Sequence, residues 1–418
     1  MVCPPAACNV RLATERKDCL CIPANRKEVQ VKITITKESL PGERRVAALP
    51  ETVRKYIDAG FAVDVETDAA EGVYVADSAY EEAGARVISN TEELFAGSDL
   101  MLKVKQPCFN GRVRKHEARM LRKGSMLIAF LHPAAPANHE VIGMLRDGNI
   151  TSFTMDGVPR ISRAQSMDAL TSMSTITGYK SVILAANMFP RFLPLLGTAI
   201  GVNPPANVLV IGAGVVGLQA IATARSLGAS VSAVDIREDA RKAAETLGAV
   251  VKGFDVPADL AVGSGGFTLR LPSEWLQKER LALADLVKRS DIVILSALVP
   301  GEVAPVLLTE PMVSAMKPGS VIVDVSIDQG GNCELTRMGE TIVSHEITVC
   351  GVANIPGSVP VLATQLYAAN LLHYVRNLIP SGTSINWEDD IVRHSLVTHK
   401  GKIVHEGTLK AMQDSETL

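Results

Sequence analysis

The fold is decided by the stretch VLVIGAGVVGLQAIATARSLGASVSAVD, residues 208–235. It opens with four apolar, mostly β-branched residues, a pattern typical of a buried parallel strand. The glycine motif Gly212-x-Gly214-x-x-Gly217 follows directly, and then come a helical run and a second apolar strand that ends at Asp235. This order of strand, glycine turn, helix, strand and acid predicts a βαβ unit that binds a dinucleotide.

Each glycine of the motif has a separate expected role. Gly212 permits the tight turn, Gly214 lets a pyrophosphate approach the backbone, and Gly217 lets helix and strand pack closely. The helix that starts beside Val215 offers free N–H groups and a partial positive charge to the phosphates. The alternative is a βαβ unit without a nucleotide, in which the glycines serve packing alone.

The acid at the end of the second strand predicts which dinucleotide is bound. Asp235 lies about 18 residues after Gly217, where a carboxylate accepts hydrogen bonds from the adenosine ribose hydroxyls. Its charge would repel a 2′-phosphate, so the sequence predicts NAD rather than NADP as the cofactor. Arg237, two residues later, weakens this preference slightly.

Composition limits the class of protein. A chain of 418 residues with 47% hydrophobic and 21% charged residues is expected to form two globular domains. The net charge of −3 gives no reason to expect nucleic acid or an anionic membrane as a partner. The most apolar region, residues 182–202, is broken by Pro190, Arg191 and Pro194, so no membrane-spanning helix is expected.

The cysteines point to a reducing compartment. Four of the seven lie in the first 21 residues, at Cys3, Cys8, Cys19 and Cys21. An odd number of cysteines without a secretory signal favours free thiols and a cytoplasmic protein. Residues 1–28 lack periodicity and are predicted to be a disordered extension. A metal cluster there is the weaker alternative because no histidine joins the cysteines, and no metal site is predicted elsewhere.

Strand and helix patterns alternate along the rest of the chain. Strands are expected at residues 29–36, 61–65, 100–104, 125–131 and 150–155, with helices between them. This alternation predicts an α/β fold with two doubly wound parallel sheets. A Rossmann NAD(H)-binding domain is expected over residues 164–359. The other domain is expected to be discontinuous, combining residues 29–163 with residues 360–418 across a cleft.

A polar loop precedes the long helix expected from residue 166 to residue 186. Gln165 could hold a nicotinamide carboxamide through its two-sided amide, and Arg160 could pair with Asp168 to fix the loop. The alternative is that these side chains serve only helix capping and surface salt bridges.

Further polar residues follow expected strands, where the ligand crevice of an open parallel sheet lies. Lys105 and His132 could bind a carboxylate and exchange a proton with a substrate. Asp328 and Asn354 occupy similar positions in the second domain, and Arg45 is a candidate carboxylate or cofactor clamp. A solvated lysine and a core histidine are the alternative interpretation of Lys105 and His132.

Together these patterns resemble one family, that of alanine dehydrogenase and the NAD(H)-binding component of proton-translocating nicotinamide nucleotide transhydrogenase. The resemblance covers about residues 29–405. It is carried by Glu43-Arg44-Arg45-Val46-Ala47, residues 159–168, Gly178-Tyr179-Lys180, residues 208–217, 300–305 and 316–324, and Gly330-Gly331-Asn332-Cys333. It implies NAD(H)-dependent hydride transfer.

The two branches of this family are both represented in the sequence. Arg160, Gln165 and Asp168 match the loop that touches the nicotinamide in the transhydrogenase component. That branch usually has a tyrosine on its mobile loop, and the best match here is Phe267. Arg45, Lys105, His132, Asp328 and Asn354 instead match substrate-site residues of alanine dehydrogenase.

The breadth of the resemblance favours a transhydrogenase alpha component. The alternatives are an amino-acid dehydrogenase that acts on a small amino or 2-oxo acid, and a non-catalytic NAD-binding module. The favoured interpretation implies a membrane subunit and an NADP(H)-binding component as partners, with cytoplasmic localisation peripheral to the inner membrane. The long helix between the expected domains also suggests a homodimer or higher oligomer.

Overall fold

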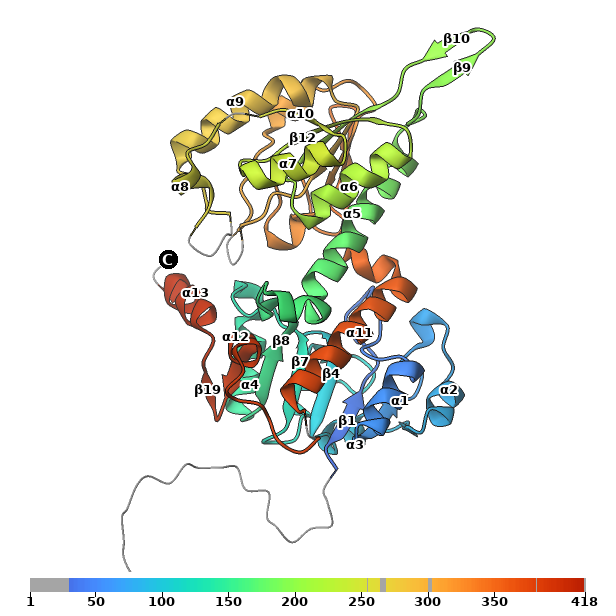
Figure 1. Ribbon diagram of the computed structural model, residues 1–418, viewed down its shortest axis with the longest axis vertical. Coiled ribbons are helices and arrows are strands. Elements are labelled where there is room, and N and C mark those ends of the chain that lie inside the picture. Colours follow the sequence, from blue (N-terminus) through green and yellow to red (C-terminus); the bar gives the residue numbers. More distant parts are fainter. Residues whose placement is uncertain (1–29, 254, 264–267, 300–302, 381, 417–418) are drawn as a thin grey trace, which may run out of the picture.

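The protein has two α/β lobes joined by long helices (Figure 1). The computed structural model describes residues 30–253, 255–263, 268–299, 303–380 and 382–416. The predicted disordered extension, residues 1–28, and Phe267 lie outside the described residues. We call the region built on an eight-stranded sheet the first lobe and the region built on a seven-stranded sheet the second lobe.

The first sheet has the order β19-β18-β8-β7-β4-β1-β2-β3. Its six strands from β8 to β3 are parallel, whereas the C-terminal strands β18 and β19 are antiparallel. The strands are β1 (Lys32–Ile35), β2 (Ala62–Glu66), β3 (Arg86–Ile88), β4 (Leu100–Lys105), β7 (Met126–Phe130), β8 (Thr151–Thr154), β18 (Leu396–His399) and β19 (Lys402–Ile403). A separate small hairpin pairs β5 (Phe109–Asn110) with β6 (Lys115–His116).

The first lobe contains helices from both ends of the chain. They are α1 (Pro50–Asp58), α2 (Asp77–Glu82), α3 (Thr91–Ala96), α4 (His139–Asp147), α11 (Pro360–Leu378), α12 (Asp390–Ser395) and α13 (Glu406–Glu416). Short 3₁₀ turns are η1 (Glu71–Val73), η2 (Glu117–Arg119), η3 (Pro136–Asn138), η4 (Met155–Gly157) and η5 (Ser162–Met167). The C-terminal segment therefore lies with the first sheet, while the predicted domain limits stay a prediction.

The second sheet has the strand order of a dinucleotide-binding fold, β13-β12-β11-β14-β15-β17-β16, parallel except for the edge strand β16. Its strands are β11 (Asn207–Ile211), β12 (Ser230–Val234), β13 (Val250–Val251), β14 (Ile292–Leu295), β15 (Val321–Asp324), β16 (Thr341–Ser344) and β17 (Ile347–Cys350). Helices and turns are α6 (Val215–Ser226), α7 (Glu238–Thr246), α8 (Ala258–Ala261), α9 (Ser273–Arg289), α10 (Glu310–Ser314), η6 (Ile327–Gln329) and η7 (Ile355–Ser358). The predicted α/β class is confirmed, with antiparallel edges added to the parallel sheets.

The long helix α5 (Ala169–Met188) connects the lobes and packs on α6 (Figure 1). A Cβ atom at Gly178 would lie 2.2 Å from the carbonyl oxygen of Val216, so only glycine allows this close approach. The helix starts three residues later than expected because η5 precedes it and Asp168 caps it.

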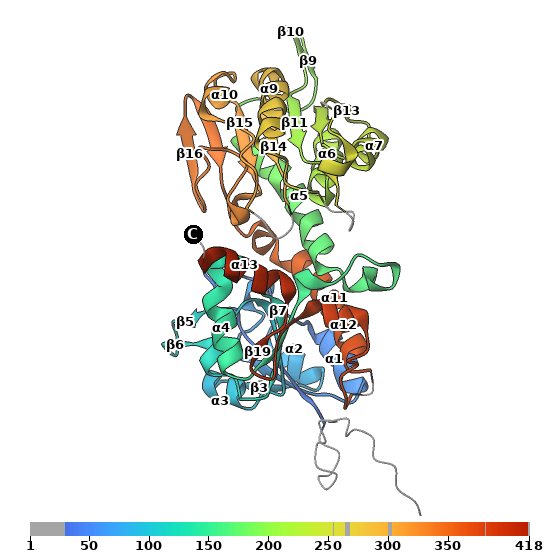
Figure 2. The same cartoon turned by 90° about the vertical axis from the view of Figure 1, so that its left-hand side faces the viewer.

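A hairpin that the sequence did not predict projects from the second lobe in both views (Figures 1 and 2). It pairs β9 (Leu196–Thr198) with β10 (Gly201–Asn203) inside the most apolar region of the chain. Its Ile200 side chain is 99% exposed. None of the helices in the described ranges combines the length and apolarity needed to cross a membrane.

Candidate active site

The glycine motif has the geometry of a close turn between β11 and α6. Gly212 has a φ of +91°, which glycine adopts without strain. A Cβ atom at Gly217 would lie 1.9 Å from the carbonyl oxygen of Gly212, so strand and helix meet there. A Cβ atom at Gly214 would have no atom within 4 Å, which leaves the backbone open ahead of Val215 and α6.

Asp235 is held against this turn. One carboxylate oxygen accepts a hydrogen bond from the Ala213 N–H at 2.7 Å, and the other accepts one from the Arg237 N–H at 2.8 Å. The Arg237 guanidinium Nε lies 3.4 Å from the same carboxylate. The side chain is therefore fixed at the carboxyl edge of the sheet, with acceptor capacity left for a ligand hydroxyl.

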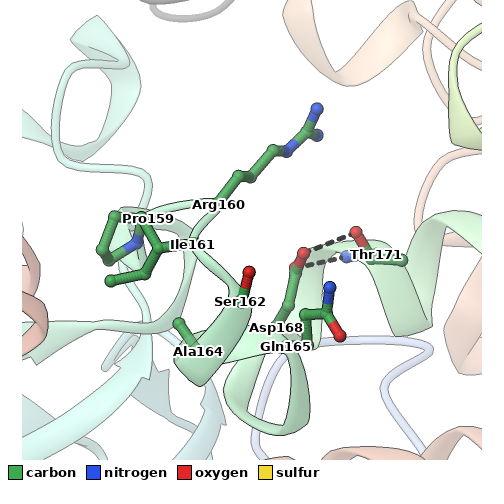
Figure 3. Close-up of a pocket in the computed structure, with 8 residues that line it drawn as sticks. All are labelled: Pro159, Arg160, Ile161, Ser162, Ala164, Gln165, Asp168 and Thr171. Carbon is green, nitrogen blue, oxygen red and sulfur yellow. Dashed lines mark hydrogen bonds between the residues drawn. The ribbon is translucent and has the colours of Figure 1, made fainter.

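The predicted nicotinamide loop lines a pocket of about 450 Å³ between residues 159 and 171 (Figure 3). Asp168 accepts hydrogen bonds from the backbone N–H of Thr171 at 2.8 Å and from its hydroxyl at 2.6 Å. In Figure 3 the Arg160 side chain points away from Asp168, so the predicted Arg160–Asp168 pair is wrong and the capping alternative is confirmed for Asp168. Gln165 is exposed and lines the same pocket.

Arg45 lies in a buried network instead of facing an open crevice. Its guanidinium donates to Glu43 at 2.8 and 2.6 Å and to the Asn354 amide oxygen at 3.1 Å. The Asn354 amide in turn donates to Glu43 at 3.0 Å. Burial raises the pKa of Glu43, but the Arg45 contacts and the Asn354 hydrogen bond outweigh it and lower that pKa. A substrate carboxylate would have to compete with Glu43 for Arg45.

Lys105 and Asp328 bring charges of the two lobes together. Lys105 ends β4, and Asp328 is exposed on η6 of the second lobe. Burial is the main cause that lowers the pKa of Lys105, helped by the Arg45 charge and opposed by Asp328 and by acidic groups of the first lobe. A lysine with a lowered pKa exchanges a proton more readily near neutral pH.

His132 follows β7 in a left-handed conformation, with a φ of +42°. Its ring stacks on Phe130, and its Nδ1 lies 3.3 Å from a carboxylate oxygen of Asp156. Burial would raise the pKa of Asp156, but His132 and a Thr154 hydrogen bond lower it to about 2. Asp156 therefore stays ionised and orients the imidazole.

The sequence reasoning did not identify Asp156. The available signal was its position just after β8, which is the parallel neighbour of the strand that precedes His132. Carboxyl ends of adjacent parallel strands meet at one edge of a sheet, so the two side chains could have been paired from the sequence.

A second lysine of β4 has a structural environment. The Lys103 amine lies 3.2 Å from Glu38 and 3.1 Å from Glu117, and all three side chains are buried. Because alternate residues of a strand face opposite sides of a sheet, Lys103 and Lys105 share a side of β4 and differ only in depth. Lys103 is enclosed, whereas Lys105 is at the edge of the sheet.

Two domain descriptions match this chain. Residues 34–177 match "Alanine dehydrogenase/PNT, N-terminal domain", and residues 181–406 match "Alanine dehydrogenase/PNT, C-terminal domain". The chain is 40% identical over 379 residues to an NAD(P) transhydrogenase alpha subunit of Rhodospirillum rubrum, covering 90% of this chain and 98% of that one. It is 31% identical over 388 residues to alanine dehydrogenase of Methanococcus maripaludis, covering 91% and 96%.

Solved structures give the same two neighbours. The transhydrogenase of Sinorhizobium meliloti superposes with a TM-score of 0.76 at 37% identity, covering 90% of this chain and 99% of that one. An L-alanine dehydrogenase superposes with a TM-score of 0.77 at 29% identity, covering 92% and 99%. With both lobes matched along their length, this chain belongs to the alanine dehydrogenase/PNT family and is an NAD-dependent oxidoreductase.

Proposed function

We propose that this chain transfers hydride between NAD(H), bound on its own glycine turn, and NADP(H), bound by a separate partner protein. The observation that carries the proposal is the 40% identity with a transhydrogenase alpha subunit over 98% of that subunit, against 31% for an alanine dehydrogenase. By analogy, the partners are an NADP(H)-binding component and a membrane subunit, which would place the chain at the membrane surface.

The bound nicotinamide would supply the hydride, which moves directly to a second nicotinamide with no proton exchanged. The turn at Gly214 would hold the pyrophosphate with N–H groups at the start of α6. Asp235 would accept hydrogen bonds from the ribose hydroxyls, and Gln165 would orient the carboxamide from the edge of its pocket. Positioning alone can supply much of the rate in such a step. Hydride transfer in a mixture with an NADP(H)-binding component tests the proposal.

A second candidate function is supported by one observation, the acid and base groups that direct hydride exchange does not use. Lys105 lies in the field of Asp328, and His132 is held by Asp156 at 3.3 Å. In an amino-acid dehydrogenase, Lys105 would bind the substrate carboxylate and His132 would exchange a proton with the substrate nitrogen or oxygen.

A panel of amino acids and 2-oxo acids with NAD(H) and ammonia separates the two functions. The chain alone is expected to be silent across the panel if it is a transhydrogenase component. Turnover that disappears in His132→Ala and Lys105→Ala, while NADH binding persists, would establish the dehydrogenase. Turnover that survives both changes would refute these two roles.

We infer further that the protein is a homodimer held partly by the β9–β10 hairpin. Ile200, Val202 and Leu195 are 99%, 70% and 62% exposed on a hairpin that stands away from its own lobe (Figure 2). Exposed apolar patches of this kind usually mark an interaction surface.

Light scattering at micromolar concentration is expected to give the mass of a dimer. The double change Ile200→Asp and Val202→Asp is expected to weaken dimerisation by at least about tenfold, because each change places a charge in an apolar contact. The matched control is Val343→Asp, at a residue 72% exposed on β16. A monomeric wild-type chain, or equal effects of the double variant and the control, would contradict the inference.

A further inference from the structure

Glu279 is a buried acid with no use in the proposed hydride transfer. It lies on α9 and is only 7% exposed. Within the described ranges it makes no hydrogen bond and no ion pair. Its neighbour Arg280 donates to the carbonyl oxygen of Val306 at 2.9 and 2.6 Å, so that guanidinium is engaged elsewhere. A buried polar side chain without a partner is unfavourable unless something else satisfies it.

The direction of α9 places Glu279 at the carboxyl edge of the second sheet. The helix leads directly into β14 and crosses over the sheet, so it runs antiparallel to the strands and its N-terminal half lies near their carboxyl ends. Leu283, one turn after Glu279 on the same helix face, belongs to the core cluster that contains Ile211 and Val234. Those residues end the two strands that bracket the glycine turn.

Electrostatics agrees with this placement. Burial raises the pKa of Glu279 to about 7, the charge of Asp235 contributes to the rise, and Arg280 opposes it. Asp235 and Arg280 are the charged groups whose fields reach this carboxyl. The field of Asp235 acts on Glu279 although the two residues belong to different elements. Two carboxyl groups therefore meet at the turn where one would suffice to accept from ribose hydroxyls.

We propose that Glu279 is a second carboxyl group of the adenosine ribose subsite and strengthens selection of NAD(H) against NADP(H). The proposal rests on the proposed binding of the ribose at Asp235. A neutral Glu279 can donate to or accept from a ribose hydroxyl, and an ionised Glu279 adds a second negative charge that repels a 2′-phosphate. Such selectivity suits a protein whose hydride must pass between two different nucleotides, because NADP(H) in this site would block the exchange.

The test compares the dissociation constants of NADH and NADPH, measured by nicotinamide fluorescence, at about pH 6 and about pH 8.5, which lie on either side of the Glu279 pKa. The variants are Glu279→Gln, Asp235→Asn and the control Glu274→Gln. Glu274 is on the same helix, but its side chain is 75% exposed and paired with Lys278. Glutamine keeps the shape and the neutral state of Glu279, and circular dichroism checks that each variant is folded.

The ratio of the NADPH to the NADH dissociation constant is expected to rise with pH in the wild type. The 2′-phosphate itself ionises with a pKa of about 6, so some of this rise is common to every variant. The rise is expected to be about three- to tenfold smaller in Glu279→Gln than in the wild type or in Glu274→Gln.

Two outcomes separate this inference from the proposal beneath it. The same pH dependence in Glu279→Gln and in Glu274→Gln, with selectivity reduced in Asp235→Asn, overturns the role of Glu279 alone. Unchanged selectivity in Asp235→Asn overturns the placement of the ribose, and the role of Glu279 falls with it.

Discussion

Replacing Lys103 with methionine is expected to lower the free energy of unfolding by about 3–5 kcal/mol. Lys103 is fully buried between Glu38 and Glu117, at 3.2 and 3.1 Å. Methionine fills a similar volume but leaves two carboxylates in the protein interior without a cation. Urea denaturation followed by circular dichroism measures the loss, and a loss below about 1 kcal/mol, the value typical of an exposed pair, would contradict the account.

The loss should also depend on pH. In the wild type, burial raises the pKa of Glu38 while Lys103 lowers it, so removing Lys103 raises that pKa further. A carboxyl group whose pKa is raised by folding loses stability as the pH increases above its unfolded value of about 4.3. The variant is therefore expected to be closest to the wild type near pH 5 and furthest from it near pH 8. The matched control is Lys115→Met, which removes an exposed pair with Glu92.

Replacing Gln165 with alanine is expected to slow hydride transfer by about 100-fold, because a reacting group that is misplaced by about 1 Å loses roughly this factor. Gln165 lines the pocket beside the capped start of α5 (Figure 3), and the proposal gives it the nicotinamide carboxamide. The pyrophosphate and ribose contacts lie elsewhere, so the affinity for NADH is expected to change far less than the rate.

The control for this prediction is Gln277→Ala, an exposed glutamine of α9. Stopped-flow measurement of hydride transfer and fluorescence titration of NADH are compared for both variants. If Gln165→Ala and Gln277→Ala transfer hydride at the same rate, Gln165 has no role in orienting the nicotinamide. If Gln165→Ala loses NADH binding and rate in equal measure, its role is binding and not orientation.

Local sequence predicted the second lobe well because its signals are local. The glycine motif, the apolar run before it and Asp235 lie within 28 residues, and the structure places all three around one turn. The helix and strand patterns of the first lobe were found for the same reason. Asp168 shows the limit, since both a pairing and a capping role were compatible with its sequence position and only the fold decided between them.

What the sequence did not predict depends on contacts between distant residues. Asp156 pairs with His132 across 24 residues, and Lys103 reaches Glu38 across 65, so neither pair leaves a local pattern. Arg45 was expected to face a ligand, yet Glu43, two residues earlier, binds it in a buried pair. The β9–β10 hairpin was not distinguished from the apolar region around it, because exposure of apolar residues cannot be seen in a sequence.

The most direct test of the central claim is hydride transfer between two nucleotides in solution. The purified chain is mixed with an NADP(H)-binding transhydrogenase component, NADPH and an oxidised NAD analogue whose reduced form absorbs at a distinct wavelength. The account predicts reduction of the analogue that needs both proteins and is slowed by Gln165→Ala. No transfer in the mixture, together with amino-acid-dependent reduction of NAD by the chain alone that is lost in His132→Ala, would contradict it.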